Sequence, residues 1–478
     1  MKRSELDKIG IPSGPAMAAA MRGCAAAAQS GRTRTQIRAA IGAVVADPGS
    51  AASDPDFGEL AAAIIAVGAQ ARTDRPRDAA FPYPTWGTDI DDAAHEQMRN
   101  ACRLPVAVAG ALMPDAHVGY GLPIGGVLAT QGAVIPYAVG VDIACRMMIT
   151  VFDVPPERLG PDRERFETIL ERNTLFGTGQ SFKKPAEHAV MDEDWKATPV
   201  TARLKDKARG QLGTSGSGNH FVEFGELEVF GAATTRVSFL SPGRYLAVLS
   251  HSGSRGPGAT VAGHYSDLAR RLHPDLPREL SYLAWLNMNA DGAEYWAAME
   301  LMGRFASANH HVIHDKIARD VGAMKGLAAG VVLQVENHHN FAWRETHVID
   351  GVEREVIVHR KGATPAGRGV LGLIPGSMAA PGYLVEGLGE PSSLHSAAHG
   401  AGRRMSRTKA RESTRWSQLR GLLESRGVHL MSAGLDESPH AYKDIEAVMA
   451  AQADLVRPLA RFMPRIVRMA PDGERAED

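Results

Sequence analysis

The spacing of hydrophobic and polar positions changes near residue 80 and divides the chain into two parts. Before this point the chain is rich in alanine, and polar turns at residues 30–35 and 47–56 separate stretches with the spacing of helices. Residues 73–84 carry three prolines and mixed charges, which is typical of a linker. We therefore predict a helical N-terminal extension with its linker over residues 1–80, and a second domain over residues 81–478.

The second part mixes strand-like and helix-like segments in no regular order. Short apolar runs between Gly, Pro and Asp turns predict strands, and longer charge-rich stretches predict helices. Strands are expected within residues 106–109, 127–130, 133–135, 147–151, 236–249, 331–335 and 352–359, and helices within 155–210, 291–324 and from His399 onward. Because strands and helices do not alternate as they do in doubly wound sheets, the predicted fold class is α+β.

Charge and aromatic content narrow the range of partners. The chain has 53 basic and 54 acidic residues, a net charge of −1, so a polyanionic partner must be met by a local basic patch. Aromatic residues make up only 6% of the chain, which gives no compositional support to nucleic-acid binding through stacked rings.

Cysteine content and hydropathy bear on the compartment. Three cysteines, Cys24, Cys102 and Cys145, form no disulfide framework, and this fits a reducing environment. No apolar run approaches the roughly 20 residues that span a bilayer. We expect a cytoplasmic protein without a membrane partner.

Three segments rich in Gly and Ser, residues 140–145, 217–221 and 249–255, each carry side chains that bind metals. With a later double histidine they supply a mixed set of one carboxylate, one thiolate and three imidazoles: Asp142, Cys145, His220, His251 and His339. This set is too large for one tetrahedral site and suits two ions that share the thiolate. His399 is left over, and we consider it a candidate nucleophile.

Two further loops, residues 372–378 and 399–402, have the glycine content that lets backbone amides surround a phosphate. The chain has no Gly-Lys pair and hence no Walker A motif, so a covalently bound nucleotide would sit on histidine rather than lysine. A helix that begins at His399 would place Arg403 and Arg407 on the face of His399, which suits backbone phosphates; a solvated basic helix is the alternative. Arg255, close to His251, is placed to hold an anionic oxygen.

Two other histidine-containing segments need a separate interpretation. His310, His311 and His314 include an i,i+4 pair, but no Gly turn and no zincin glutamate accompany them, so we expect a solvated helix face. Asp115 and His117 either orient metal ligands or belong to a turn packed beneath the site.

Taken in order, these segments resemble the RtcB family of RNA-splicing ligases. The matching motifs are Met113-Pro-Asp-Ala-His, Val139-Gly-Val-Asp-Ile-Ala-Cys, Gly218-Asn-His-Phe-Val-Glu, His251-Ser-Gly-Ser-Arg-Gly, His338-His-Asn, Arg360-Lys-Gly-Ala, Ile374-Pro-Gly-Ser-Met, His399-Gly-Ala-Gly-Arg and Met405-Ser-Arg-Thr-Lys-Ala. They occur in one order over residues 104–458, some three-quarters of the chain, which makes the resemblance highly specific.

The resemblance implies an α+β fold with a deep cleft, two Mn²⁺ ions, and GTP-dependent joining of RNA 3′-phosphate or 2′,3′-cyclic phosphate ends to 5′-hydroxyl ends, in RNA repair or tRNA splicing. Cys145 would bridge the ions, with His251 and His339 at one and Asp142 and His220 at the other. His399 would be guanylylated and pass GMP to the RNA. The implied guanylate contacts are Asn219, His220, Phe221, Val222, Glu223, His339, Asn340, Pro375, Gly376, Ser377, Met378, His399, Gly400, Ala401 and Gly402. Arg255, Lys361, Arg403 and Arg407 would hold phosphate or RNA.

The chain also departs from the family's pattern. Tyr120 stands where the family has a basic residue, Gly382 where a serine is expected, and the family's C-terminal Lys-Gly has no counterpart. These departures indicate a divergent branch, and two other functions remain in competition. One is a dimetal phosphoesterase acting on RNA termini, which would need the metal ligands but not His399; the other is an RNA-end-binding protein without turnover. The sequence does not identify an activating protein partner.

Overall fold

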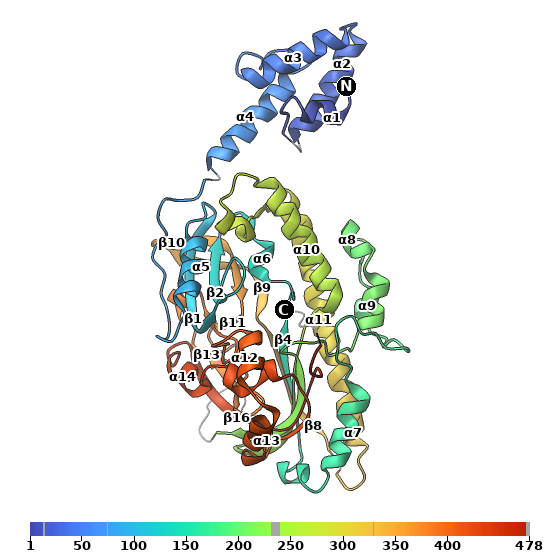
Figure 1. Ribbon diagram of the computed structural model, residues 1–478, viewed down its shortest axis with the longest axis vertical. Coiled ribbons are helices and arrows are strands. Elements are labelled where there is room, and N and C mark those ends of the chain that lie inside the picture. The colour runs from blue at the N-terminus through green and yellow to red at the C-terminus, as the bar shows by residue number, and fades with distance from the viewer. Residues whose placement is uncertain (13–14, 74, 231–239, 328, 475–478) are drawn as a thin grey trace. The chain divides into compact units, whose positions relative to one another are not determined.

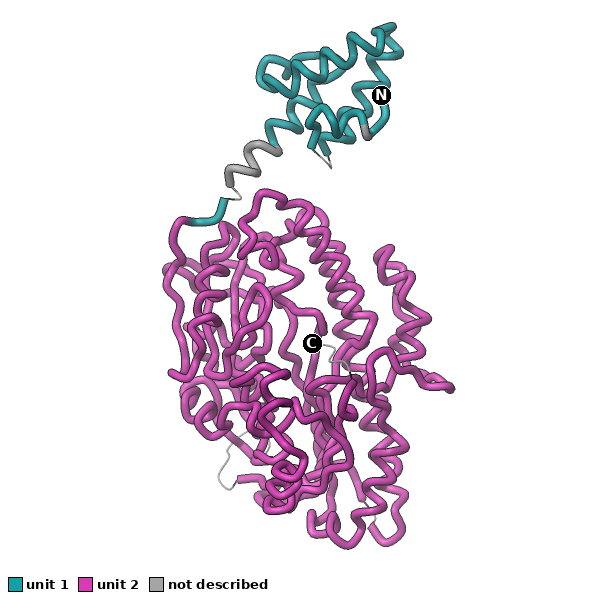
Figure 2. Tube along the Cα trace, in the orientation of Figure 1, with its two compact units in different colours: residues 1–77 teal, residues 78–478 magenta. Residues whose placement is uncertain are grey.

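The structure is a computed structural model that describes residues 1–12, 15–73, 75–230, 240–327 and 329–474. The described chain forms two compact units, Met1–Arg77 and Asp78–Asp478 (Figure 2). The division between them falls within the proline-containing stretch that the sequence analysis identifies as a linker. Residues 236–239 of the predicted strand 236–249 lie outside the described residues.

The first unit consists of short helices around a hydrophobic core of its own. The helices are rich in alanine, which has the highest helix propensity. Gly23 has no side chain and so lets its helix pack closely against Phe57: a Cβ at Gly23 would lie 2.7 Å from the Phe57 ring. Thr33 and Gln36 form a capping box at the start of the third helix. The helices are α1 (Arg3–Asp7), α2 (Pro15–Gln29), α3 (Arg34–Ala46) and α4 (Gly58–Thr73), and their core includes Leu6, Met17, Ile41 and Leu60.

The larger sheet of the second unit has the strand order β12-β13-β16-β5-β6-β4-β8, with β15 beside β16. Strand β4, which lies between β6 and β8, is buried along its whole length, because Met147, Ile149 and Val151 pack into one core and Phe152 packs into another. Burial on both faces explains why this strand is a continuous apolar run. The strands are β4 (Arg146–Phe152), β5 (Phe221–Val229), β6 (Gly243–Ser252), β8 (Val331–His338), β12 (Leu371–Ile374), β13 (Gly382–Gly387), β15 (His429–Ser432) and β16 (Val456–Met469).

A smaller antiparallel sheet of order β1-β2-β10-β9 meets the larger one at His339. The chain leaves the larger sheet at His338 and enters the smaller one at Asn340, so His339 lies between the two. The strands of the smaller sheet are β1 (Ala107–His117), β2 (Ile124–Thr130), β9 (Asn340–Ile349) and β10 (Val352–Lys361); two short pairs join β3 (Ala133–Val134) to β7 (Leu286–Asn287) and β11 (Ala363–Pro365) to β14 (Ser396–Ala398).

Helices cover the larger sheet on one face. Figure 1 shows α10 (Arg255–Leu272) and α11 (Asp291–Gly322) side by side, and α11 and α7 (Arg163–Asn173) share a hydrophobic core with β4, β5 and β6. None of the helices in the described ranges is both long and apolar enough to cross a membrane. The other helices of this unit are α5 (Asp92–Cys102), α6 (Pro136–Val139), α8 (Pro199–Ala202), α9 (Lys205–Gln211), α12 (Arg407–Ser413), α13 (Trp416–Ser425) and α14 (Ile445–Ala450).

The predicted α+β class is confirmed, and one predicted helix is wrong. The stretch 291–324 contains α11, and the predicted strands at 331–335 and 352–359 lie in β8 and β10. His399, however, lies in a loop after β14, and α12 begins only at Arg407. Gly402 in this loop has a φ of 74°, a conformation that ends helical geometry.

Candidate active site

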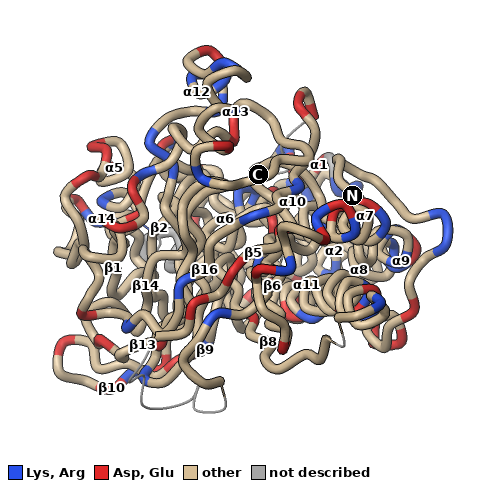
Figure 3. Tube along the Cα trace, turned by 90° about the horizontal axis from the view of Figure 1, so that it is seen from below, with Lys and Arg blue, Asp and Glu red and all other residues tan. Residues whose placement is uncertain are grey.

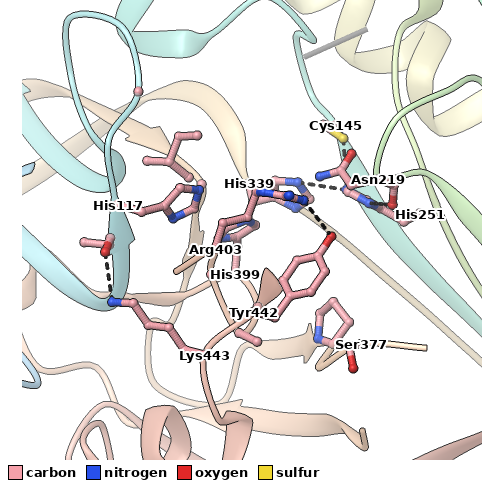
Figure 4. Close-up of a pocket in the computed structure, with 18 of the residues that line it drawn as sticks. His117, Cys145, Asn219, His251, His339, Ser377, His399, Arg403, Tyr442 and Lys443 are labelled. Carbon is pink, nitrogen blue, oxygen red and sulfur yellow. Dashed lines mark hydrogen bonds between the residues drawn. The ribbon is translucent and has the colours of Figure 1, made fainter. Parts of the chain in front are cut away.

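A cavity of about 1240 Å³ opens where the two sheets of the second unit meet. Its lining comes from the loop between β1 and β2, the segment before β4, the neighbouring ends of β5 and β6, and loops around residues 375–382, 399–407 and 437–443. All five predicted metal ligands and His399 line this one cavity, although they are spread over more than half of the sequence. In Figure 4, His339 lies between His399 and the pair formed by Cys145 and His251.

Strand pairing explains why the predicted metal ligands converge. Cys145 directly precedes β4, His220 directly precedes β5, and His251 is the second-last residue of β6. These strands are neighbours, and His251 is in register with both Met147 and Phe221. The same end of the sheet therefore presents all three side chains.

The ligand atoms form a chain of short contacts that passes through the thiol. The Cys145 Sγ lies 3.4 Å from Nε2 of His220 and 3.1 Å from Nε2 of His251. The His251 Nε2 lies 3.2 Å from Nε2 of His339, and the His220 Nε2 lies 3.2 Å from Oδ2 of Asp142. The set thus divides into two halves that share Cys145: one adds Asp142 and His220, and the other adds His251 and His339. The ligand atoms of Cys145, His220 and His251 lie close enough together to hold one metal ion.

The chemistry of these atoms fits a bound cation. The Nδ1 of His251 lies 3.1 Å from the carbonyl oxygen of Asn219, to which it can only donate, so the Nε2 of a neutral ring carries a lone pair. Burial lowers the pKa of His251 to about 3, which keeps this ring neutral. Lone pairs of sulfur and nitrogen therefore face one another in a buried space, at separations close to the roughly 3.5 Å edge of a tetrahedral metal site.

Asp142 is held in its ionised form. Burial on its own would raise the pKa of Asp142, but the hydrogen bond from His220 and the charge of Arg255 lower it below its ordinary value. The Asp142 Oδ1 also accepts hydrogen bonds from the Ser254 backbone N–H at 2.9 Å and the Ser254 hydroxyl at 3.3 Å. Gly253 must lack a side chain, because a Cβ there would lie 2.0 Å from the Asp142 carboxylate.

Arg255 is not placed as the sequence analysis expects. It is buried, lies outside the cavity lining, and donates to Nδ1 of His220 and to the carbonyl oxygen of Ser215, each at 3.2 Å. Its position depends on a backbone φ of 54° at the start of α10. Arg255 therefore orients His220 from behind instead of reaching an anionic oxygen in the cavity. Because the guanidinium only donates, a neutral His220 carries its proton on Nε2, and a metal bound there would release that proton.

His399 is oriented by Asp115, from the end of β1. The Asp115 Oδ2 accepts hydrogen bonds from Nδ1 of His399 at 2.7 Å and from the backbone N–H groups of His399 at 3.1 Å and Gly400 at 3.3 Å. Asp115 is fully buried, whereas His399 is 16% exposed and lines the cavity. With Nδ1 protonated, the Nε2 lone pair of a neutral His399 is available as a nucleophile. The ring of His399 lies 4.9 Å from that of His339, between centroids.

The residues that the resemblance assigns to guanylate line the cavity, with one exception. Val222 is fully buried and packs into the core beneath β5, so it does not reach the cavity. In a strand, successive side chains point to opposite faces, and its neighbours Phe221 and Glu223 do line the cavity. Burial raises the pKa of Glu223 well above its ordinary value, which favours a protonated carboxyl there.

Lys361, Arg403 and Arg407 line the cavity, but none is a freely solvated cation. Lys361 is buried, donates to the carbonyl oxygen of Tyr120 at 2.5 Å, and has its pKa lowered by burial to about 7. Arg403 donates to the backbone oxygen of Asp436 at 2.8 Å, and Arg407 pairs with the Asp436 carboxylate at 3.0 Å. Figure 3 shows basic and acidic segments interleaved around α12 and α13. Arg403 and Arg407 were expected on one face of a basic helix. Instead, Arg403 lies on a loop, Arg407 begins α12, and both are paired with acidic residues or backbone oxygens.

Lys443 has a role at the site that no sequence motif indicates, and two histidines expected on a solvated helix face are buried. The Lys443 Nζ donates to the backbone oxygens of Pro114 at 3.2 Å and Ala116 at 2.9 Å, which fixes the strand end that carries Asp115 (Figure 4). His310 and His314, expected on a solvated face, are fully buried: the Ser250 Oγ lies 2.9 Å from Nδ1 of His310 and 2.7 Å from Nε2 of His314.

Comparisons with known proteins agree with this arrangement. The family model described as "tRNA-splicing ligase RtcB" matches residues 97–198 and 176–470. The RNA-splicing ligase RtcB of Escherichia coli strain K12 is 33% identical over 412 residues, covering 78% of this chain and 94% of that protein. The tRNA-splicing ligase RtcB of Thermococcus kodakarensis is 30% identical over 437 residues, covering 78% of this chain and 90% of that protein. The family model covers every segment that lines the cavity except the loop at residues 88–91. A match of this extent shows that the chain belongs to the RtcB family.

Proposed function

We propose that the protein is an RNA ligase that joins RNA 3′-phosphate or 2′,3′-cyclic phosphate ends to 5′-hydroxyl ends, with GTP as the second substrate and His399 as the guanylylated residue. The observation that carries this proposal is the pairing of His399 with a fully buried Asp115, beside a cluster of metal-type ligands in the same cavity. A nucleotidyl-transfer step needs a nucleophile, an orienting group and charge stabilisation, and this cavity supplies residues for each.

The first step follows from the orientation of His399. Because the Asp115 carboxylate accepts the hydrogen bond from Nδ1–H, the Nε2 lone pair attacks the α-phosphorus of GTP; an Nε2–phosphorus bond forms and the bond to pyrophosphate breaks. Gly376 and Ser377 also line the cavity, where their backbone N–H groups can donate to phosphate oxygens. Arg404, exposed and on the cavity wall, adds a cation for the leaving pyrophosphate.

The second part of the reaction transfers GMP to RNA. Where the RNA ends in a 2′,3′-cyclic phosphate, water first adds to its phosphorus and the bond to the 2′-oxygen breaks, which leaves a 3′-phosphate and a 2′-hydroxyl. An oxygen of the 3′-phosphate then displaces His399 from the phosphorus of GMP and gives an RNA end activated by GMP. The 5′-hydroxyl oxygen of the other RNA end then attacks the 3′-phosphorus, loses its proton, and expels GMP. Lys361 would contact the RNA phosphate, because it lines the cavity and directly precedes Gly362, where a Cβ would lie 3.2 Å from Cε1 of His399.

Two Mn²⁺ ions are the cofactors that we propose. Asp142, Cys145 and His220 would hold one, and Cys145, His251 and His339 the other. When bound, such ions supply positive charge that offsets charge developing on phosphate oxygens during the displacement. Since Cys24, Cys102 and Cys145 form no disulfide, we place the activity in the reducing environment of the cytoplasm.

Covalent labelling with α-³²P-GTP and Mn²⁺ tests the proposal. Wild-type protein should retain the label after denaturation, and His399→Ala should retain none. His311→Ala is a matched control, because His311 lies on α11 outside the cavity and should label as the wild type does. Absence of label in wild-type protein with metal bound would overturn the ligase proposal.

A second candidate is a metal-dependent phosphoesterase that opens RNA 2′,3′-cyclic phosphates without nucleotidyl transfer. It is favoured by the metal-ligand cluster, whose side chains hold one another in place without His399. Hydrolysis of a cyclic phosphate by wild-type protein that never labels with GTP would select this function.

A further inference from the structure

Three tyrosines from separate parts of the chain form an aromatic cluster at the rim of the cavity. Tyr120 comes from the β1–β2 loop, Tyr137 from α6, and Tyr282 from the 3-10 helix Arg278–Leu283, and all three line the cavity. The ring of Tyr137 lies 4.7 Å from that of Tyr282, and the ring of Tyr120 lies 5.7 Å from that of Tyr282 and 6.3 Å from that of Tyr137, between centroids. Tyr120 is nevertheless 63% exposed, so most of its ring faces the solvent at the cavity mouth.

The backbone around the exposed Tyr120 is held by contacts on both sides. On one side, Gln97 receives a hydrogen bond from the backbone N–H of Gly119 at 3.0 Å and donates one to the Gly119 carbonyl oxygen at 2.6 Å. On the other side, Gly121 has a φ of 71° and packs so closely that a Cβ would lie 3.1 Å from Tyr282. The carbonyl oxygen of Tyr120 itself accepts the hydrogen bond from Lys361. An exposed aromatic side chain on a backbone held in this way is suited to bind a partner, because little backbone conformational entropy is lost on contact.

Two cations border the aromatic cluster. The Lys361 Nζ lies 5.1 Å from the ring centroid of Tyr137, and the guanidinium of Arg270 lies 5.4 Å from that of Tyr282. Aromatic rings next to positive charges match a nucleotide, whose base stacks and whose phosphate is anionic. The cluster is also continuous with the reaction centre: Lys361 precedes Gly362, where a Cβ would lie 3.2 Å from Cε1 of His399.

We propose that Tyr120, supported by Tyr137 and Tyr282, is a stacking platform for a nucleobase of the single-stranded RNA end whose phosphate enters the cavity. This inference rests on the proposed function, since it takes RNA as the substrate. The platform binds a base by its face and therefore tolerates any sequence.

RNA binding without GTP tests the platform. The probe is a fluorescent single-stranded RNA that ends in a 3′-phosphate, followed by anisotropy with the full-length protein in the presence of Mn²⁺. Tyr120→Ala should weaken binding about tenfold, the loss expected for one stacked base, whereas Tyr120→Phe, which keeps the ring, should bind as the wild type does. Tyr245→Ala is the matched control, because Tyr245 lies on β6 outside the cavity lining.

A second RNA with three abasic nucleotides at its 3′ end separates stacking from charge. On this RNA, Tyr120→Ala should bind no more weakly than the wild type does. Tyr120→Lys should not restore binding of the normal RNA, because a cation does not replace a ring face. The platform would be overturned if Tyr120→Ala bound the normal RNA as tightly as the wild type does, or if Tyr120→Phe lost as much affinity as Tyr120→Ala. It would also be overturned if Tyr120→Ala had the same defect on the abasic RNA as on the normal RNA, or if Tyr120→Lys fully restored binding.

The failure of the platform and the failure of the proposed function give different results. The binding measurement contains no GTP, so it does not depend on guanylylation of His399. Wild-type protein that labels with GTP while Tyr120→Ala binds RNA normally would refute the platform alone. Wild-type protein that neither labels nor binds RNA would refute both, and binding through Tyr120 without labelling would refute only the ligase chemistry.

Discussion

Asp115 holds both the ring and the backbone of His399. One oxygen of the Asp115 carboxylate accepts hydrogen bonds from Nδ1 of the His399 ring and from the backbone N–H groups of His399 and Gly400. This arrangement fixes the tautomer and the direction of Nε2 at the same time. Asp115→Asn removes the negative charge and keeps the size of the side chain. We expect the rate of GTP labelling to fall about 10- to 100-fold, with the extent of labelling of His399 eventually restored.

Labelling time courses at several pH values check this first prediction. A positioning role predicts that Asp115→Asn slows labelling at every pH tested, because the amide no longer fixes the direction of the His399 ring through Nδ1. An unchanged rate would show that Asp115 does not act through His399. His399→Ala, which has no nucleophile, gives the baseline.

Removal of the shared thiol should remove both metals. Cys145 contacts His220 on one side and His251 on the other, so Cys145→Ser replaces a ligand that belongs to both halves of the cluster. We expect the metal content, measured by atomic emission after gel filtration, to fall from about two ions per chain to well below one. Cys102→Ser is the control, since Cys102 is buried at the end of α5 and outside the cavity; equal metal loss in both variants would contradict this role of Cys145.

Lys361 should make stability depend on pH above neutrality. Its pKa of about 7 in the folded protein compares with an ordinary value of 10.5, so between these values the unfolded chain binds more protons at this position. The free energy of unfolding should therefore rise with pH across this window, by at most about 1.4 kcal/mol per unit. Denaturant unfolding of wild type and Lys361→Met at pH 7.5 and 9.5 measures the effect: the wild type should gain stability relative to the variant, and parallel behaviour would refute the assignment.

The buried Ser250 should contribute to stability well beyond its size. Its hydroxyl contacts His310 and His314, and the second nitrogen of His314 lies 2.7 Å from the hydroxyl of Thr150. Ser250→Ala leaves buried ring nitrogens without a partner, which costs about 1–3 kcal/mol of unfolding free energy. Ser425→Ala, at the exposed end of α13, should change stability by less than about 0.5 kcal/mol, and equal effects in the two variants would contradict the network.

The first unit should be dispensable for chemistry. Each unit has a hydrophobic core of its own, and every residue that lines the cavity belongs to the second. A fragment of residues 78–478 should fold, with a cooperative thermal transition, and label with GTP at the wild-type rate. Loss of labelling in a fragment that unfolds cooperatively would show that residues 1–77 take part in the reaction.

The candidate site residues are easier to recognise in the sequence than the contacts around them. Asp142, Cys145 and His220 occur in short glycine-containing motifs, so the sequence marks them locally. The burial of His310 and His314 depends on Ser250 and Thr150, which lie far away in sequence on β6 and β4, and no local pattern reports such contacts.

The segment after His399 shows a different limit of pattern reasoning. Basic residues at helical spacing predict a helix, but the left-handed conformation of Gly402 interrupts it, and the helix starts only after Ser406, whose hydroxyl caps the Lys409 N–H at 3.2 Å. Composition is an average over the whole chain and carries no information on where residues lie. The low aromatic content therefore does not indicate that Tyr120, Tyr137 and Tyr282 come together at the rim of the cavity.

The position of β16 has a consequence for synthesis of the protein. This strand, Val456–Met469, lies between β13 and β5 and is the link between the β12-β13 pair and the remaining strands of the larger sheet. Until a ribosome has released residue 469, the sheet that carries Cys145, His220 and His251 is incomplete and has an unpaired edge at β5. A growing chain can therefore contain every metal ligand and His399 while its sheet is still open, and such an edge is a place where chaperones or other nascent chains can bind.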